Sequence, residues 1–148
     1  MSAGSTRRAW NGAAAWLETR LGMNLVLLVS RAGIAAVFLA SGRTKVSGLL
    51  TVTDSAVELF RTEYRLPWID PAVAAHAAAY AEHLFPLLLV LGLFTRLSAL
   101  ALLGMTLVIE VFVYPDAWPT HLSWAAPLLL LAARGAGRWS IDHHAGLR

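Results

Sequence analysis

Four long apolar runs restrict what this chain can fold into. They cover residues 21–40, 71–94, 97–114 and 118–133 of the 148-residue sequence. A helix needs about 20 residues to cross the roughly 30 Å of hydrocarbon in a bilayer, because it rises 1.5 Å per residue. Runs of this length fit spanning helices and are too long for the spanning strands of a barrel. The sequence therefore predicts an all-α membrane protein.

The composition agrees with a chain that lies in the lipid bilayer. Only 14% of its residues are charged and 57% are hydrophobic, whereas about 25% are charged in a soluble domain. The formal net charge is +3, but the basic residues lie mostly beside the apolar runs and form no block, so nucleic acid is not an expected partner. The chain has no cysteine, which excludes disulfides, thiolate metal sites and thiol redox chemistry.

The connections between the runs favour a single four-helix transmembrane bundle. Residues 92–96 and 115–119 are short links, which make neighbouring helices antiparallel. The longer polar connection, residues 42–70, repeats apolar side chains at helical spacing, so we expect a short interfacial helix between spans one and two. Residues 1–20 show the same spacing next to basic side chains, which predicts an N-terminal amphipathic helix at the membrane surface.

The expected domain organisation has three parts. Residues 1–20 form the amphipathic segment, residues 21–134 the transmembrane domain, and residues 135–148 a solvated cytoplasmic tail that includes His143 and His144. We expect the first run to be a retained span, because it is longer than the apolar core of a signal peptide and contains Arg31. The spans are expected at about residues 21–41, 71–94, 97–114 and 118–134.

The distribution of positive charge predicts the orientation of this multi-pass protein. With four crossings, seven basic residues lie on the side of the two termini: Arg7, Arg8, Arg20, Arg96, Arg134, Arg138 and Arg148. The other side holds four: Arg43, Lys45, Arg61 and Arg65. The positive-inside rule therefore places both termini in the cytoplasm.

Three ionisable residues are expected near the middle of the membrane. Arg31 lies about halfway along span one, and Glu82 and His83 lie about halfway along span two. Each such residue costs about 2.5 to 3.5 kcal/mol to insert, so it needs a partner or a wet cavity. One interpretation is a structural Arg31–Glu82 ion pair that fixes how two helices dock. The other is a proton relay or an anchor for a quinone carbonyl, in which His83 changes charge near neutral pH.

A second polar group is expected one turn below the outer surface. It comprises His76, Glu110 and His121, contributed by three different spans. Their nitrogen and oxygen atoms suit zinc or copper, and three such ligands leave an open coordination position. The alternative is an ordinary polar network that closes the bundle beneath Trp118.

Several segments of the chain, in the same order and spacing, resemble the DoxX family of small four-span membrane proteins. They are Arg31 with FLASGRTK at 38–45, AE at 81–82 with LGLFTR at 91–96, and GAGRWSID at 135–142. The run FVYPDAWPTH at 112–121 is similar to a branch found near copper-responsive peptide gene clusters.

The resemblance implies a bacterial inner-membrane protein. The family is named for a subunit of thiosulfate:quinone oxidoreductase, other members are linked to oxidative-stress complexes, and distant relatives look like assembly chaperones. By position, Arg31, Lys45 and Glu82 match the family's recurrent polar sites. The resemblance does not assign catalytic residues.

Three function hypotheses follow. The first is an accessory membrane subunit of a quinone-linked redox system or of a metal or oxidative-stress response, with a redox or metal-stress protein as partner. It is favoured over an enzyme acting alone, because the sequence has no glycine-rich phosphate loop and no nucleophile elbow. The second is a metal-handling or transport protein. The third is an assembly chaperone or scaffold, and the alanine-rich second span also permits a homo-oligomer.

Overall fold

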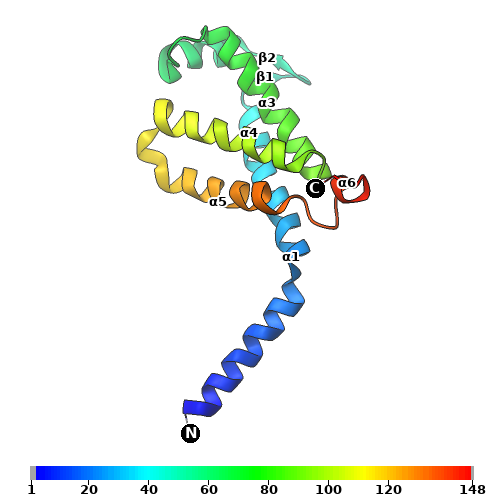
Figure 1. Cartoon of the computed structure of the whole chain (residues 1–148). Helices are drawn as coiled ribbons and strands as arrows, with labels where there is room; N and C mark the ends of the chain where they lie inside the picture. The colour runs from blue at the N-terminus through cyan, green and yellow to red at the C-terminus, as the bar shows by residue number, and fades with distance from the viewer. Residues whose placement is uncertain (1–2, 148) are drawn as a thin grey trace.

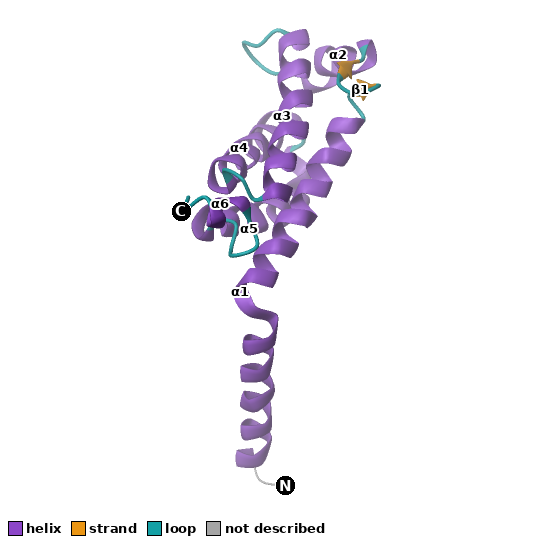
Figure 2. Ribbon diagram, turned by 90° about the vertical axis from the view of Figure 1, so that its right-hand side faces the viewer, coloured by secondary structure: helices purple, strands orange, loops and turns teal. Residues whose placement is uncertain are grey.

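The computed structural model describes residues 3–147 and begins with one long helix, α1 (Ala3–Arg43). Gly22 interrupts α1 with non-helical angles (φ 49°, ψ 138°) that glycine adopts at little cost. The part before Gly22 extends away from the rest of the molecule, whereas the part after it packs against the other helices (Figures 1 and 2). The predicted N-terminal helix is therefore present and separated from the first predicted span at one residue. Its place at a membrane surface stays a prediction.

Within residues 3–147, three helices are long and apolar enough to cross a membrane: Leu21–Arg43, Pro71–Leu91 and Thr95–Val113. The second is α3 (Pro71–Leu91), and the third combines α4 (Thr95–Val108) with a wider turn, η2 (Ile109–Val113). They correspond to the first three predicted spans.

The fourth predicted span forms a helix, α5 (Trp118–Arg134), which has 17 residues and follows the short turn η3 (Pro115–Ala117). It is not among the helices that satisfy the length and hydropathy needed for a crossing. Figure 1 shows α4 and α5 running side by side, across the direction of α1 and α3. The all-α architecture is confirmed, but the four-span bundle is not.

Local sequence signals account for the ends of α3. The Asp70 carboxylate accepts hydrogen bonds from the backbone N–H groups of Ala72 (2.9 Å) and Val73 (3.2 Å), and Pro71 occupies the first turn. Both features are typical of helix starts. Gly92 ends the helix in the left-handed conformation (φ 67°), which glycine adopts without the steric penalty of a Cβ.

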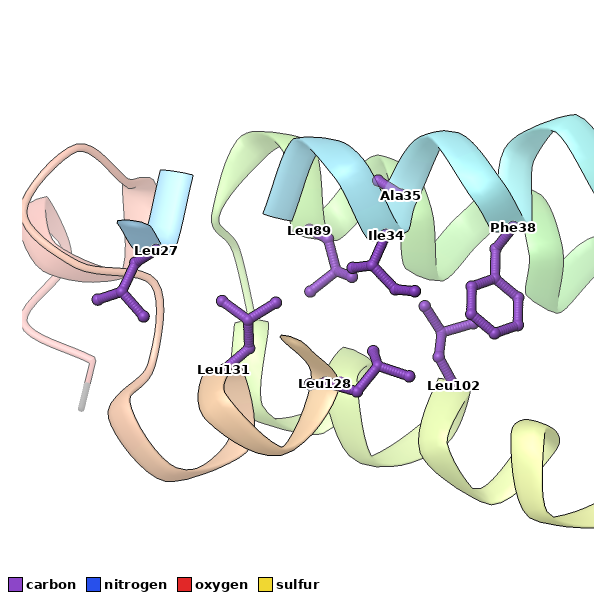
Figure 3. Close-up of a cluster of buried hydrophobic side chains, with 9 residues drawn as sticks. Leu27, Ile34, Ala35, Phe38, Leu89, Leu102, Leu128 and Leu131 are labelled. Carbon is purple, nitrogen blue, oxygen red and sulfur yellow. The ribbon is translucent and has the colours of Figure 1, made fainter. Parts of the chain in front are cut away.

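One apolar core joins the four long helices (Figure 3). Its fully buried side chains are Leu27, Ile34, Ala35 and Phe38 of α1, Leu89 of α3, Ala99 and Leu102 of α4, and Leu128 and Leu131 of α5. Because α1 packs mainly on α3 and α4 mainly on α5, this core is where the two pairs meet.

The connection between α1 and α3 holds a hairpin that the sequence analysis did not predict. Its strands are β1 (Val46–Ser47) and β2 (Thr51–Val52), paired antiparallel. Two residues per strand are too few to show an alternating pattern. The helix expected in this connection is present as α2 (Asp54–Leu59), followed by the wider turn η1 (Phe60–Tyr64).

The C-terminal segment is not the free tail that we predicted. After α5 the chain turns back and ends in α6 (Ile141–His144), next to the turn between α3 and α4. The Asp142 carboxylate accepts hydrogen bonds from the backbone N–H groups of Phe94 (2.7 Å) and Thr95 (2.9 Å). The Asp142 N–H donates to the carbonyl of Gly92 (2.8 Å). Within it Ala136 and Ser140 are buried, whereas Arg138, Trp139, His143 and His144 are exposed.

Candidate functional site

Lys45 and Glu82 form a buried ion pair between the end of α1 and the middle of α3. Lys45 Nζ lies 2.7 Å from Glu82 Oε2, and the two side chains are 5% and 4% exposed. The Ser41 hydroxyl accepts from Lys45 Nζ (3.0 Å) and donates to Glu82 Oε1 (3.2 Å). We refer to Ser41, Lys45, Glu82 and His83 as the buried cluster. Each charge in it has the partner that burial requires.

Gly42 allows the two helices to come close enough for this cluster to form. A Cβ atom at Gly42 would lie 2.9 Å from His83 Nδ1 and 3.0 Å from Glu82 Cβ, closer than side-chain atoms normally approach. Small residues play this part at helix contacts in membranes. Beyond α1, the chain at Lys45 is fixed by the hairpin, because the Lys45 carbonyl accepts from the Thr53 N–H (3.0 Å).

His83 completes the buried cluster and holds an unused acceptor. Its Nδ1 lies 2.7 Å from the carbonyl oxygen of Ala79, so in the neutral ring Nδ1 carries the proton and Nε2 is the acceptor. Nε2 is buried and has no hydrogen-bond partner among residues 3–147. Buried polar atoms are rarely left unpaired, and such an exception calls for an explanation.

His76 repeats the backbone contact of His83 without its burial. It lies two helical turns earlier on α3, and its Nδ1 is 2.8 Å from the carbonyl oxygen of Ala72. The His76 side chain is exposed. The same α3 geometry thus gives one exposed histidine and one half-buried histidine whose Nε2 is buried, which makes His76 a matched reference for His83.

Arg31 does not pair with Glu82, so the predicted midplane ion pair is wrong. The guanidinium donates four hydrogen bonds of 2.8–2.9 Å, all to backbone carbonyls: those of Leu89, Val90, Ala136 and Trp139. Two of these carbonyls belong to the last turn of α3, where a helix leaves acceptors unsatisfied and carries partial negative charge. Arg31 therefore lies two turns away from Glu82 along α3 and joins α1 to the C-terminal segment.

The structure does not assemble the predicted three-ligand metal site. His121 Nδ1 lies 2.5 Å from Glu110 Oε2, and the His121 ring packs against Trp124 with centroids 5.1 Å apart. His76 is elsewhere, in edge contact with Tyr80. The described part of the chain has no group of three or more His, Cys, Asp or Glu side chains placed to hold a metal ion. The predicted set is wrong because its members were matched by depth alone, which does not fix the direction of a side chain.

Two tyrosines, Tyr64 and Tyr114, link the connection between α1 and α3 to the residue that follows η2. The Tyr114 hydroxyl donates a hydrogen bond to Glu63 Oε1, and the rings of Tyr64 and Tyr114 meet edge to face with centroids 5.8 Å apart. The Glu63 carboxylate raises the pKa of Tyr114 by accepting this hydrogen bond. Burial raises the pKa of Tyr64.

This contact is expected to make the folded protein less stable in alkali. A tyrosine whose pKa is raised by folding holds its proton more tightly in the folded state, so stability is lost as the pH rises above about 10, the unfolded value. Thermal unfolding between pH 8 and pH 11 checks this. The Tyr114→Phe variant is expected to lose less stability over that interval than the wild type, and an unchanged slope would contradict the assignment.

Ser41 is the member of the buried cluster that the sequence analysis missed. It lies four residues before Lys45, a spacing that would place the two side chains on one face if the helix continued, although α1 ends at Arg43. This spacing is the sequence signal that was available for it. Glu82, which both residues contact, is far away in sequence and gave no local signal.

Comparisons with known proteins found a matching family model and a similar protein. The DoxX family model matches residues 26–115, which include the whole buried cluster. A Haemophilus influenzae protein described only as uncharacterized is 29% identical over 130 residues, covering 82% of this chain and 84% of that protein. No solved structure gives a significant match. Since the family model covers more than half of the sequence, the chain belongs to the DoxX family.

Proposed function

We propose that this DoxX-family membrane protein is an accessory subunit of a quinone-linked redox system, and that its buried cluster contacts the quinone head group. The observation that carries the proposal is His83 Nε2, a buried acceptor without a partner among the described residues, beside the Lys45–Glu82 ion pair. An unpaired acceptor closed off from water binds a donor more strongly than an exposed one does.

The hydrogen-bonding group that the cluster leaves free is an acceptor, which fits the reduced form of a quinone. Hydroquinone hydroxyl groups donate hydrogen bonds, and His83 Nε2 is the free acceptor in this cluster. Lys45 is less suited to hold a quinone carbonyl, because its ammonium already contacts Glu82 Oε2, the Ser41 hydroxyl and the Ser41 carbonyl. When bound, a quinone would supply two-electron, two-proton chemistry.

The residues of this chain would act on the proton. A proton received at His83 Nε2 gives an imidazolium, and the neighbouring Glu82 carboxylate of the cluster stabilises that positive charge. Lys45 and Ser41 hold the carboxylate in place through their contacts with its two oxygens. Without cysteine, the chain has no thiol to carry electrons, so a partner protein is the proposed electron carrier.

The family resemblance supports the same direction. The family takes its name from a subunit of a thiosulfate:quinone oxidoreductase, and a role in metal or oxidative stress would place the subunit in a related system. We further propose the bacterial inner membrane as its location, with a multi-pass topology and cytoplasmic termini, on the basis of the charge distribution along the sequence.

Quinone retention by two matched variants tests the proposal. The protein is extracted with its native lipid, and the quinone per protein is measured by mass spectrometry. His83→Asn keeps an N–H able to reach the Ala79 carbonyl but removes Nε2, so quinone binding is expected to weaken roughly tenfold, or about 1.4 kcal/mol. His76→Asn makes the same change at the exposed position of α3 and is expected to leave retention unchanged.

Equal retention by the two variants would contradict the proposal. So would a wild-type extract without quinone. If that extract instead held a stoichiometric protein partner, the scaffold hypothesis would account for it, and the polar residues of the spans would then serve only to fix how the helices pack.

A further inference from the structure

A basic cavity lies just beyond the C-terminal end of α3, about three turns along the helix from the buried cluster at its middle. It has a volume of about 590 Å³ and opens where the beginning of α4 meets the C-terminal segment and the part of α1 that follows Gly22. In Figure 1 this is the region where α5 runs into the C-terminal segment. Among the side chains that the structure describes, three arginines line the cavity: Arg96, Arg134 and Arg138.

The positive charge in this cavity is largely unused within the protein. The side chains of Arg134 and Arg138 are exposed and make no hydrogen bond or ion pair with any of residues 3–147. Arg96 donates through Nη1 to the carbonyls of Ala132 (2.6 Å) and Ala133 (2.9 Å), which holds its guanidinium at the end of α5. Two free guanidinium groups beside one held in place are suited to an oxyanion such as a phosphate group.

A second observation points to a ligand in the same place. Thr95 lines the cavity, and its hydroxyl is buried without a hydrogen-bond partner among the described residues. Asp142 also lines the cavity, but both of its oxygens accept hydrogen bonds from the start of α4. The Asp142 charge is therefore already engaged, and the cavity keeps its basic character.

Part of the remaining cavity wall is apolar, and it lies at the level where spans begin. Met23, Leu27, Phe94 and Leu97 line it together with the arginines. Two of the helices that are long enough to cross a membrane start here, at Leu21 and Thr95. Phe94 and Leu97 are 52% and 62% exposed. A ligand that matches both the arginine-lined part and the apolar part of the cavity carries an anionic group and apolar chains. Such a ligand reaches the cavity from the membrane surface.

We propose that this cavity binds an anionic phospholipid. Its phosphate would contact Arg134 and Arg138, and its acyl chains would lie along Phe94 and Leu97. Basic pockets at the ends of membrane helices recognise anionic lipid head groups in this way. The site is separate from the buried cluster, so it does not depend on the proposed quinone contact.

Lipid titration of the purified full-length chain tests the site. The protein is delipidated in neutral detergent and titrated with phosphatidylglycerol, phosphatidylcholine or inorganic phosphate, and bound lipid is counted by native mass spectrometry. Phosphatidylglycerol is expected to bind at least tenfold more tightly than phosphatidylcholine. Arg134→Gln/Arg138→Gln is expected to remove that preference. Arg61→Gln/Arg65→Gln removes the same charge from the connection before α3 and is expected to keep it.

Three outcomes would overturn the proposal. The first is equal affinity for the two lipids in the wild type, and the second is equal affinity for phosphatidylglycerol in the two double variants. The third is displacement of the lipid by inorganic phosphate at equal concentration, which would assign the cavity to free phosphate. Unfolding midpoints measured alongside establish that both double variants are folded, which is expected because all four side chains are exposed.

Discussion

Replacing Lys45 with methionine is expected to lower the free energy of unfolding by about 3–5 kcal/mol. The substitution leaves the Glu82 carboxylate buried without its counter-charge, and breaking one side of a buried ion pair has an effect of this size. The variant breaks the 2.7 Å ion pair of the buried cluster, where both side chains are almost fully covered. Unfolding in mild detergent with increasing sodium dodecyl sulfate, followed by tryptophan fluorescence, measures the change.

Two controls separate the charge effect from a loss of packing. The double variant Lys45→Met/Glu82→Gln removes both charges and is expected to recover most of the stability. Arg61→Met breaks the Arg61–Glu58 pair, whose side chains are 61% and 54% exposed, and is expected to cost less than about 1 kcal/mol. If the double variant were no more stable than Lys45→Met, the ion pair would not be the source of the effect.

The Arg31→Lys variant is expected to be less stable than the wild type by about 3 kcal/mol, although it keeps the charge. A guanidinium donates in a fixed planar fork, and here it satisfies four backbone carbonyls at once. One ammonium has three donors and cannot reproduce that geometry, so buried carbonyls are left without partners at about 1–3 kcal/mol each. The same unfolding titration measures the decrease.

Hydrogen exchange distinguishes this role from a general loss of stability. Because two of the acceptors, Ala136 and Trp139, belong to the C-terminal segment, the Asp142 amide is expected to exchange faster in Arg31→Lys. Arg96→Lys, which affects an exposed arginine with two backbone contacts, is expected to be less stable than the wild type by about 1 kcal/mol. Unchanged exchange at Asp142 would show that Arg31 does not hold the segment.

The local features of the fold were predictable from the sequence, because each depends on a few consecutive residues. The apolar runs indicated the four long helices, and Pro71 after Asp70 marked the start of α3. The C-terminal segment was less predictable. Its composition is that of a solvated tail, and non-local contacts distinguish it from one: those of Arg31 with Ala136 and Trp139, and that of Asp142 with the start of α4.

The candidate site was predicted less well than the fold, for a physical reason. Glu82 was identified as a buried charge that needs a partner, but depth along the membrane suggested Arg31 and the structure supplies Lys45. Lys45 follows the end of α1 and comes back to Glu82 because a short hairpin holds it there. Partners that meet through such non-local contacts leave no mark on helical periodicity.

The hydrogen bonds of Arg31 also set an order for the biogenesis of this protein. Translation proceeds from the N-terminus, and two of the carbonyls that Arg31 contacts lie 105 and 108 residues further along the chain. For the whole interval in which those residues are being made, the arginine has to be accommodated by water, lipid head groups or the insertion machinery. The helix that carries Arg31 is therefore made before its charge is fully matched, and its final position depends on residues synthesised much later.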